Sequence, residues 1–177
     1  MSKKNYKIVL TGAESTGKTT LSKQLAEHYN TTWIPEFARE YIENMNRPYN
    51  YNDIVYIAQK QIKLVSEYEK KANKFLFIDT YLIITKIWFL WRFKKYPKWL
   101  DKYLSSGNID LYLLCYNDLP WVPDPVRENP GKNRDKLYRD YLHEILFLKK
   151  RYEIIKGKGQ ERLLNAIQAI DLSIQVI

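Results

Sequence analysis

The sequence predicts an α/β fold in which a five-stranded parallel sheet is covered by helices on both faces. Short apolar or β-rich runs alternate with amphipathic helical stretches along the chain, and this alternation is typical of a parallel sheet between two helical layers. The 177 residues suit a single domain, which buries about 70% of its unfolded surface and needs no disulfide or metal to fold. Because ligands bind at the carboxyl ends of parallel strands, the side chains that follow each strand are the candidates for function.

Three strands and two helices are predicted in the first half of the chain. Runs of β-branched and other apolar residues identify the strands, and apolar residues spaced three and four apart identify the helices. Pro35 stops the second strand, and Asn52-Asp53 can cap the second helix. The predicted elements are a strand over Tyr6–Thr11, a helix over Lys18–Tyr29, a strand over Thr32–Ile34, a helix from Asn52 to about Lys71, and a strand over Phe75–Ile78.

Two strands and four helices are predicted in the second half. Gly107 and Gly157 close the elements that precede them. A Pro- and charge-rich loop covers Asn117–Arg134, and we predict a lid-like segment over about residues 117–139 of the single domain. The predicted elements are a helix after Asp79 through Phe93, a helix near Lys98–Leu104, a strand over Leu111–Cys115, a helix over Asp135–Tyr152, a strand over Glu153–Ile155, and a helix over about Gln160–Ile170.

Composition predicts a soluble intracellular protein. The chain has 29 Lys plus Arg against 20 Asp plus Glu, a net charge of +9, and one cysteine, Cys115, which we expect to be a buried reduced thiol. The first residues lack an apolar run of signal-peptide length, and the most apolar segment, Leu82–Phe93, falls short of the ~20 apolar residues of a membrane span. We therefore expect a cytoplasmic location and no membrane partner. The positive charge suits nucleic acid, an acidic surface or a phosphorylated small molecule.

A phosphate-binding loop follows the first strand. Residues 12–19, GAESTGKT, match G-x-x-x-x-G-K-[ST] at every fixed position, with a strand before them and a helix after. Glycines let backbone N–H groups wrap the phosphates, Lys18 would reach the β- and γ-phosphates, and Thr19 would hold Mg²⁺. A glycine-rich turn with an incidental lysine is the alternative. The predicted ATP-binding residues of this loop are Gly12, Ala13, Glu14, Ser15, Thr16, Gly17, Lys18, Thr19 and Thr20.

Acidic side chains follow the second and third predicted strands. Asp79 lies where P-loop proteins carry the carboxylate that holds Mg²⁺ directly or through water, and a helix cap is its alternative role. Glu36 lies where a kinase needs a carboxylate to accept or orient the proton of a substrate hydroxyl. Its alternative role is a first-turn helix acid paired with Arg39. Either acid could take the proton, so both are candidate catalytic and substrate-binding residues.

The loop after the fourth predicted strand has the composition of a lid. Trp121, Asp124 and Arg127 lie in its Pro-rich segment, and Arg134 follows. Small-molecule kinases use lid arginines to neutralise the transferring phosphoryl group and to exclude water. We predict that Arg127 is catalytic, that Arg134 binds the phosphates of ATP, and that Trp121 and Asp124 contact the substrate. A solvated basic loop stiffened by prolines is the alternative.

Five segments together resemble the ribosylnicotinamide kinase domain of NadR-type NAD-salvage proteins. The resemblance covers nearly the whole chain, and the ordered combination is more specific than the phosphate loop alone. The segments are GAESTGKTT (residues 12–20), WIPEFARE (33–40), FLFIDT (75–80) with TKIW (85–88), PWVPDPVRENP (120–130) and GKGQERL (157–163).

The resemblance implies a three-layer P-loop NTPase fold related to nucleoside and adenylate kinases. It implies transfer of the γ-phosphate of ATP to the 5′-hydroxyl of nicotinamide riboside, which gives nicotinamide mononucleotide. The roles it implies are ATP and Mg²⁺ binding for Gly12, Gly17, Lys18 and Thr19, the acids after the third and second strands for Asp79 and Glu36, the lid arginine for Arg127, and a place beside adenine for the loop that contains Gly157 and Gly159.

Substrate contacts are also implied. Arg39 joins the candidate ligands, and Trp33, Trp88 or Trp121 could stack on a cationic nicotinamide ring, with core packing as the alternative. Relatives of this kind commonly carry an acid where this chain has Tyr81.

Other functions stay open. One is a kinase for another nucleoside or a nucleoside monophosphate, and another is an ATP-binding regulatory or nucleic-acid-binding module. Dispersed basic residues argue against nucleic acid, and no Asn-Lys-x-Asp guanine signature follows the fourth strand. The helix Leu82–Phe93 is apolar on nearly every face, which predicts either a homo-oligomer interface or burial under the lid helices.

Overall fold

The computed structural model describes residues 5–106 and 109–174. Its elements in chain order are β1 (Tyr6–Thr11), α1 (Lys18–His28), β2 (Thr32–Ile34), α2 (Phe37–Glu43), α3 (Tyr51–Glu69), β3 (Phe75–Asp79), α4 (Leu82–Phe93), α5 (Trp99–Ser106), β4 (Leu111–Cys115), α6 (Lys132–Phe147), β5 (Tyr152–Ile155) and α7 (Gln160–Ile174). The predicted stop at Gly107 lies outside the described residues.

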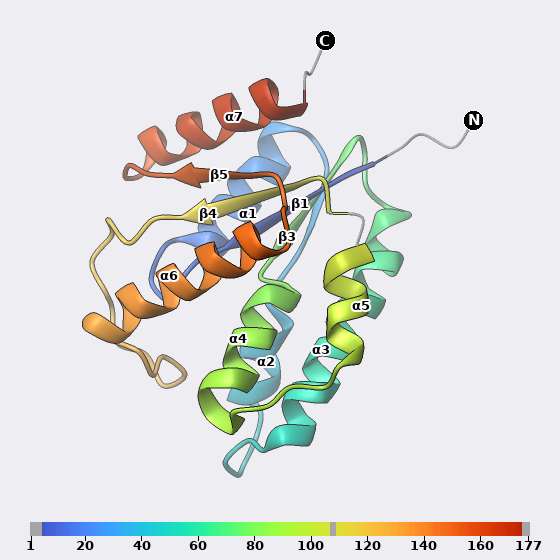
Figure 1. The fold of residues 1–177 in the computed structure, drawn as a ribbon. Coiled ribbons are helices and arrows are strands. Elements are labelled where there is room, and N and C mark those ends of the chain that lie inside the picture. Colours follow the sequence, from blue (N-terminus) through green and yellow to red (C-terminus); the bar gives the residue numbers. More distant parts are fainter. Residues whose placement is uncertain (1–4, 107–108, 175–177) are drawn as a thin grey trace.

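The five strands form one parallel sheet in the order β2-β3-β1-β4-β5 (Figure 1), which confirms the predicted sheet. β1 lies in the middle, with Leu10 opposite Asp79 of β3 and Thr11 opposite Leu114 of β4. In the sheet, β1 lies between β3 and β4, and because the strands are parallel the carboxyl ends of these three strands meet at one edge. That edge carries the phosphate loop, Asp79 and the start of the lid.

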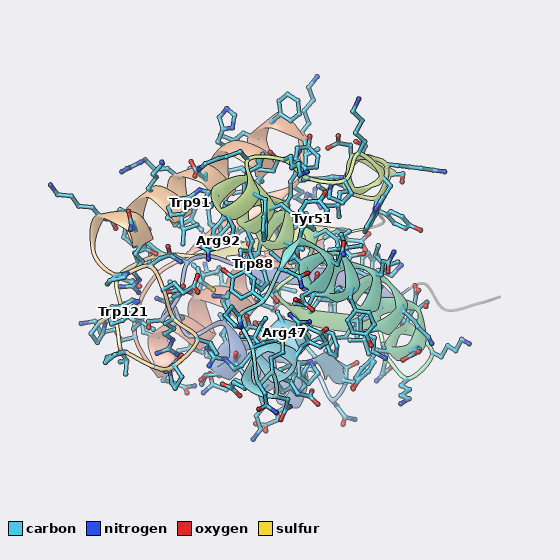
Figure 2. All side chains as sticks on the ribbon, turned by 90° about the horizontal axis from the view of Figure 1, so that it is seen from below. Arg47, Tyr51, Trp88, Trp91, Arg92 and Trp121 are labelled. Atoms are coloured by element: carbon cyan, nitrogen blue, oxygen red, sulfur yellow. The ribbon has the colours of Figure 1, made fainter. Side chains whose placement is uncertain are left out.

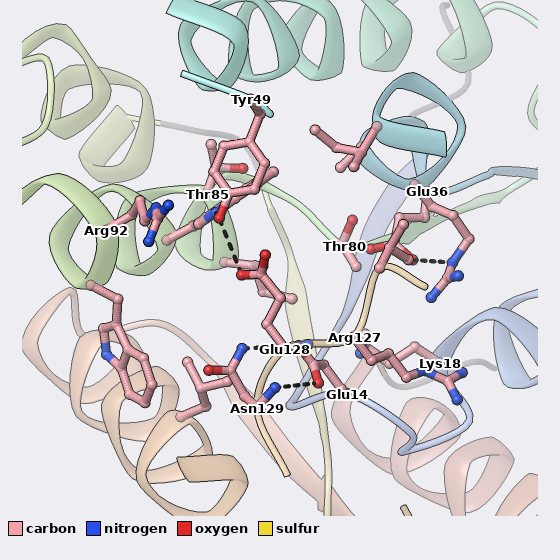
Figure 3. Close-up of a pocket in the computed structure, with 18 of the residues that line it drawn as sticks. Glu14, Lys18, Glu36, Tyr49, Thr80, Thr85, Arg92, Arg127, Glu128 and Asn129 are labelled. Carbon is pink, nitrogen blue, oxygen red and sulfur yellow. Dashed lines mark hydrogen bonds and ion pairs between the residues drawn. The ribbon is translucent and has the colours of Figure 1, made fainter. Parts of the chain in front are cut away.

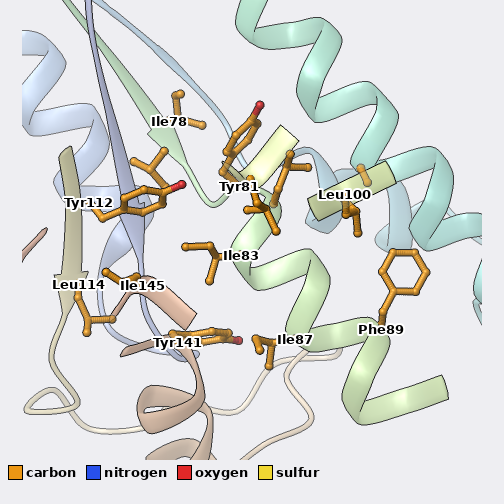
Figure 4. Packing of buried hydrophobic residues seen from close by; sticks show 14 of the residues in the cluster. Ile78, Tyr81, Ile83, Ile87, Phe89, Leu100, Tyr112, Leu114, Tyr141 and Ile145 are labelled. Atoms are coloured by element: carbon orange, nitrogen blue, oxygen red, sulfur yellow. The ribbon is translucent and has the colours of Figure 1, made fainter. Parts of the chain in front are cut away.

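Helices cover both faces of the sheet (Figure 1). One face packs against α1 and α7, where Leu25 is buried with Leu10. The other face packs against α3, α4 and α6, and Figure 4 shows Ile83 and Tyr112 among the buried side chains there. Burial of each large apolar side chain contributes about 1.5–3 kcal/mol, so the two clusters hold the strand ends in fixed positions.

Two helices begin differently from the sequence-based expectation. Helix α2 is not among the predicted elements; it has only seven residues, and none of them is buried. Helix α3 begins at Tyr51 rather than at Asn52, because its cap is Asn50: the Asn50 side chain accepts a hydrogen bond from the Asp53 backbone N–H, and the Asp53 carboxylate accepts one from the Asn50 backbone N–H at 2.7 Å. The reciprocal bonds form a capping box.

Helix α6 is displaced from the predicted range Asp135–Tyr152. It begins earlier, at Lys132, and ends at Phe147. It ends there because Lys149 takes a positive φ of 52° and Tyr152 already belongs to β5. Helix α7 continues beyond the predicted end, to Ile174.

Helix α4 has its apolar faces covered within the chain. Ile83, Ile87 and Phe89 are buried, and no α4 residue is among the exposed large hydrophobic side chains of the described residues. The helix packs against α3, α5 and α6. Packing within the chain therefore explains why the helix is apolar on nearly every face. The apolar pattern no longer supports a homo-oligomer interface, which stays a prediction.

Two expectations from composition concern membranes and the thiol. In the described part of the chain, no helix combines the length and the apolar character that a membrane span needs. Cys115 is a buried free cysteine, as predicted, and burial raises the pKa of its thiol to about 11.

Candidate functional site

The phosphate loop connects β1 to α1. Gly12 has a φ of 140°, and a Cβ atom there would lie 2.7 Å from the carbonyl oxygen of Cys115. Gly17 has a φ of 74° and is the N-cap residue of α1. The Lys18 Nζ atom donates a hydrogen bond to the Ala13 carbonyl oxygen at 2.8 Å. Backbone conformation and close approach therefore require the two glycines, and the loop faces the N-terminus of a helix, where anions bind.

Thr19 and Asp79 form a pair of oxygen ligands beside the loop. Thr19 Oγ1 donates to Asp79 Oδ2 at 2.5 Å, while Asp79 Oδ1 is buried without a hydrogen-bond partner. Burial and the negative charge of Glu36 raise the pKa of the Asp79 carboxyl to about 6, against the opposing charge of Lys18. The N-cap residue of α4 is Tyr81, so Asp79 does not cap that helix. Within residues 5–106 and 109–174, no group of three or more His, Cys, Asp or Glu side chains could hold a metal.

A cavity of about 610 Å³ extends from the phosphate loop to helix α4 (Figure 3). Lys18 lines it from the phosphate loop, Glu36 and Arg39 from the start of α2, Trp88 from α4, and Arg127 from the lid. The cavity therefore brings together predicted site residues from four segments that are far apart in the sequence. Asp79, Thr19, Arg134 and the glycines after β5 do not line it.

Glu36 fits the alternative role of a helix-start acid paired with Arg39, while its role towards a substrate proton stays a prediction. It is the N-cap residue of α2 and lines the cavity, and its carboxylate oxygen lies 3.6 Å from Arg39 Nε. Arg39 also lies 3.1 Å from Glu43 and 3.2 Å from Asp124. These ion pairs fix the Arg39 guanidinium at the cavity wall.

Asp124 orients the lid arginine. Its carboxylate lies 2.8 Å from Arg127 Nε and accepts a hydrogen bond from the Val126 backbone N–H at 3.0 Å. Arg127 also donates to the carbonyl oxygen of Val122. Since Arg127 lines the cavity and Asp124 does not, the predicted substrate contact of Asp124 is replaced by contacts with arginines.

Arg134 braces the phosphate loop. It is buried, and its guanidinium donates to the carbonyl oxygens of Glu14, Ser15 and Leu119, each at 2.8 Å. All three acceptors are backbone atoms. Arg134 therefore supports the phosphate loop and does not line the cavity, and its contact with ATP stays a prediction.

The three candidate stacking residues have different surroundings. Trp88 lines the cavity, and its Nε1 atom donates to the Tyr49 hydroxyl at 3.1 Å, with the two rings edge to face at 5.0 Å. Trp33 packs against the cluster between the sheet and α1. Trp121 donates from Nε1 to Glu14 at 3.3 Å and lies on the lid, apart from Trp88 (Figure 2). Of the three, Trp88 alone lines the cavity, and stacking on a bound ring stays a prediction.

Several cavity residues were not predicted. Tyr49 and Arg92 line the end of the cavity away from the phosphate loop (Figure 3), and Trp91 also lines the cavity. Trp91 and Arg92 belong to the same aromatic helix as Trp88, so the helical repeat contained a signal for them. Tyr49 precedes α3 and follows no strand, so only the tertiary fold reveals it.

The turn between β5 and α7 is tied to the end of β4. The Gly157 backbone N–H donates to Asp118 at 2.7 Å, and the buried Arg162 donates to Asp118 and to the carbonyl oxygen of Gly157. Gly157 and Gly159 both have positive φ values. Their predicted contact with adenine stays a prediction.

Tyr81 faces the hydrophobic core rather than the cavity (Figure 4). It is buried, and burial raises the pKa of its hydroxyl to about 12. The position at which relatives commonly carry an acid therefore contributes no charge to this cavity.

Residues 7–162 match a family model described as an AAA domain. The trifunctional NAD biosynthesis/regulator protein NadR of Salmonella typhimurium is 30% identical over 147 residues, which are 78% of this chain and 35% of that protein. The protein of the same name from Escherichia coli matches to the same extent. These matches confirm the resemblance to NadR-type proteins, and the chain spans about a third of the length of these curated relatives.

Solved structures share the fold. NadR in complex with NR has a TM-score of 0.85 at 23% identity, over 98% of this chain and 52% of that chain. Deoxyadenosine kinase from M. mycoides with bound dATP has a TM-score of 0.61 at 12% identity, over 94% of this chain and 100% of that chain. The predicted fold class, a P-loop sandwich of the nucleoside kinase type, is thereby confirmed.

Proposed function

The chain belongs to the AAA-domain family of P-loop proteins, and on that premise we propose that it is an ATP-dependent nucleoside kinase. The proposed acceptor is nicotinamide riboside, phosphorylated on its 5′-hydroxyl to give nicotinamide mononucleotide. The 30% identity with NadR over 147 residues supports this choice, as does the likeness to NadR in complex with NR.

The observation that supports the proposal most strongly is one continuous cavity that joins the phosphate loop to an aromatic wall, formed by Trp88 and its aromatic neighbours. Its volume of about 610 Å³ lies within the range of small-molecule sites. Lys18 and Arg127 supply positive charge, Glu36 supplies a carboxylate, and Trp88 supplies an aromatic face. A phosphoryl donor at the loop and a nucleoside against the aromatic wall would meet between these groups.

The proposed mechanism is positioning combined with electrostatic stabilisation. The backbone N–H groups of residues 13–19 wrap the phosphates of ATP, and Lys18 leaves the Ala13 carbonyl oxygen to bind them. Glu36 orients the acceptor hydroxyl and takes its proton as the oxygen attacks the γ-phosphorus and ADP leaves. Arg127 offsets charge on the transferring group. Glu36 has this role rather than Asp79 because Glu36 lines the cavity and Asp79 does not.

Asp79 and Thr19 fit a role in Mg²⁺ binding. Both present hard oxygen atoms, and Asp79 Oδ1 is buried without a partner. Mg²⁺ is usually held by one or two such groups together with substrate phosphates, so the pair suffices. When bound, the ion would neutralise charge on the β- and γ-phosphates.

A substrate panel tests the proposal. The protein is incubated with ATP, Mg²⁺ and either nicotinamide riboside, thymidine, adenosine, cytidine or a nucleoside monophosphate, and ADP and phosphorylated products are measured. We expect the highest kcat/KM with nicotinamide riboside. Turnover of another acceptor would identify a different substrate, and no product with any acceptor would overturn the kinase proposal.

A second assay addresses the competing class of nucleic-acid-binding modules. Oligonucleotide affinity is titrated against salt, because a phosphate-binding surface loses affinity steeply as salt rises. We expect no measurable binding at moderate salt.

Cytoplasmic location stays an expectation.

A further inference from the structure

Glu14 is a phosphate-loop residue whose side chain is turned towards the lid. Its Oε1 atom accepts hydrogen bonds from the Glu128 backbone N–H at 3.1 Å and from Asn129 Nδ2 at 2.9 Å. Its Oε2 atom accepts from the Asn129 backbone N–H at 3.0 Å and from Trp121 Nε1 at 3.3 Å. Every partner is a donor and belongs to the lid. The phosphate-loop motif leaves this position free, so the motif does not explain a carboxylate here.

The neighbouring residue anchors the other end of the same lid segment. Ser15 Oγ donates to the Val122 carbonyl oxygen at 3.3 Å and accepts from the Val122 backbone N–H at 3.1 Å. Together, Glu14 and Ser15 hold residues 121–122 and 128–129. Arg127 lies between these two anchored ends and lines the cavity, as Figure 3 illustrates with Glu14, Glu128 and Asn129.

We propose that Glu14 is a positioning residue that latches the lid to the phosphate loop and so holds Arg127 over the transferring phosphoryl group. The role of Arg127 in this proposal rests on the proposed kinase function. The attachment of the lid to Glu14 does not depend on that function. A carboxylate suits four donors because each of its two oxygens accepts two hydrogen bonds. An amide offers one oxygen, keeps at most two of these bonds, and turns an NH₂ group towards N–H donors.

The first test measures lid opening and needs no activity. Trypsin cleavage after Arg127 in the free protein is followed by mass spectrometry, because local opening controls cleavage in a folded protein. We expect Glu14→Gln to raise the cleavage rate at this bond at least about fivefold, with an unchanged urea midpoint. The matched control, Glu67→Gln, removes the same charge from the exposed face of α3, where Lys63 is 3.8 Å away, and should cleave like the wild type. Equal cleavage rates in Glu14→Gln and wild type would overturn the latch.

The second test asks whether Glu14 acts through Arg127. In the wild-type background Glu14→Gln should lower kcat about 10–100-fold, but in the Arg127→Ala background the same change should lower it less than about threefold. Equal factors in both backgrounds would overturn the positioning role. If the wild type transfers no phosphoryl group, the kinase proposal and with it the Arg127 role fail, whereas the cleavage result still decides the latch.

A variant from the lid side covers the case in which Glu14→Gln does not fold. Asn129→Asp replaces the Nδ2 donor with a carboxylate oxygen facing Glu14, so repulsion should open the lid. We expect the same faster cleavage after Arg127. Wild-type cleavage of Asn129→Asp would contradict the latch.

Discussion

Glu36 and Asp79 are both acids beside the phosphate loop, but only Glu36 lines the cavity. We predict that Glu36→Gln lowers kcat for nicotinamide riboside by about 10²–10⁴-fold, the usual contribution of a positioned base. The KM for ATP should change less than about twofold, because Glu36 is not part of the phosphate loop. Steady-state kinetics check both values, with Glu40→Gln on the exposed side of α2 as control. An unchanged kcat would remove Glu36 from the reaction.

Gly12 is the residue at which the backbone leaves least room. Gly12→Ala would bring a Cβ atom to 2.7 Å from the Cys115 carbonyl oxygen, at a φ of 140° that side chains rarely adopt. We predict a loss of about 3 kcal/mol or more in the free energy of unfolding, measured by urea denaturation. Gly131→Ala is the control: its φ is 57° and its ψ is −128°, and no atom lies within 4 Å, so only backbone strain of about 1–3 kcal/mol is expected. Similar losses in both variants would contradict this account.

The sequence alone predicts the fixed positions of the phosphate loop, but it does not predict which residues the lid side chains contact. Gly12, Gly17 and Lys18 follow from the chemistry of binding phosphate, which is the same in every such loop. Arg134 is predicted to bind phosphate because it is a cation of the lid segment. In the structure, its guanidinium N–H groups donate hydrogen bonds to backbone carbonyl oxygens. Trp121 looked like a stacking residue, yet its indole binds Glu14. Residue type gives the available chemistry, and tertiary contacts decide how it is used.

Helix α3 depends on a charged cap. Asp53 is 5% exposed, accepts hydrogen bonds from Arg47, Tyr41 and the Asn50 backbone N–H, and has its pKa held well below the usual range, mainly by Arg47. We predict that Asp53→Asn lowers the free energy of unfolding by about 1–2 kcal/mol at pH 7, measured by urea denaturation. Asn52→Ala, one residue away in the same first turn, is the control and should change stability by less than about 0.5 kcal/mol.

The same carboxylate gives a pH dependence. Because its folded pKa lies below the unfolded value of about 4, its contribution is complete above that pH and is lost as the pH falls towards the folded pKa. The stability difference between wild type and Asp53→Asn should therefore shrink below about pH 4. A difference that stays constant from pH 7 to pH 3 would contradict the charged cap.

Long or strongly patterned elements were predictable, and short or interrupted ones were not. Strands β3 and β4 and most of β1 are buried because both faces of the sheet are covered there, so their apolar sequence reports their burial, whereas the edge strands β2 and β5 are only partly buried. Helix α2 has only seven residues and buries none of them, so burial leaves little trace in its sequence. The end of α6 depends on the left-handed conformation of Lys149. Glycine adopts this conformation readily and other residues rarely do, so a lysine in the sequence does not predict it.

The net charge of +9 is partly explained by cations with structural partners. Arg134 and Arg162 bind backbone carbonyl groups, and the buried Lys86 lies 2.6 Å from Glu144 and 3.1 Å from Asp101. Lys18 and Arg127 line the cavity. These cations have roles in the interior and at the cavity, so part of the positive charge is explained without nucleic acid.

Transfer of label from ATP tests the central claim most directly, because it separates a kinase from an ATPase of the same fold. The protein is incubated with γ-³²P-labelled ATP, Mg²⁺ and nicotinamide riboside, and the products are separated by chromatography. We predict label in nicotinamide mononucleotide in equal amount to the ADP formed. Lys18→Ala should lower this product by about 10³-fold, and Lys23→Ala, exposed on the same helix, should not. Label found only in inorganic phosphate would contradict the account.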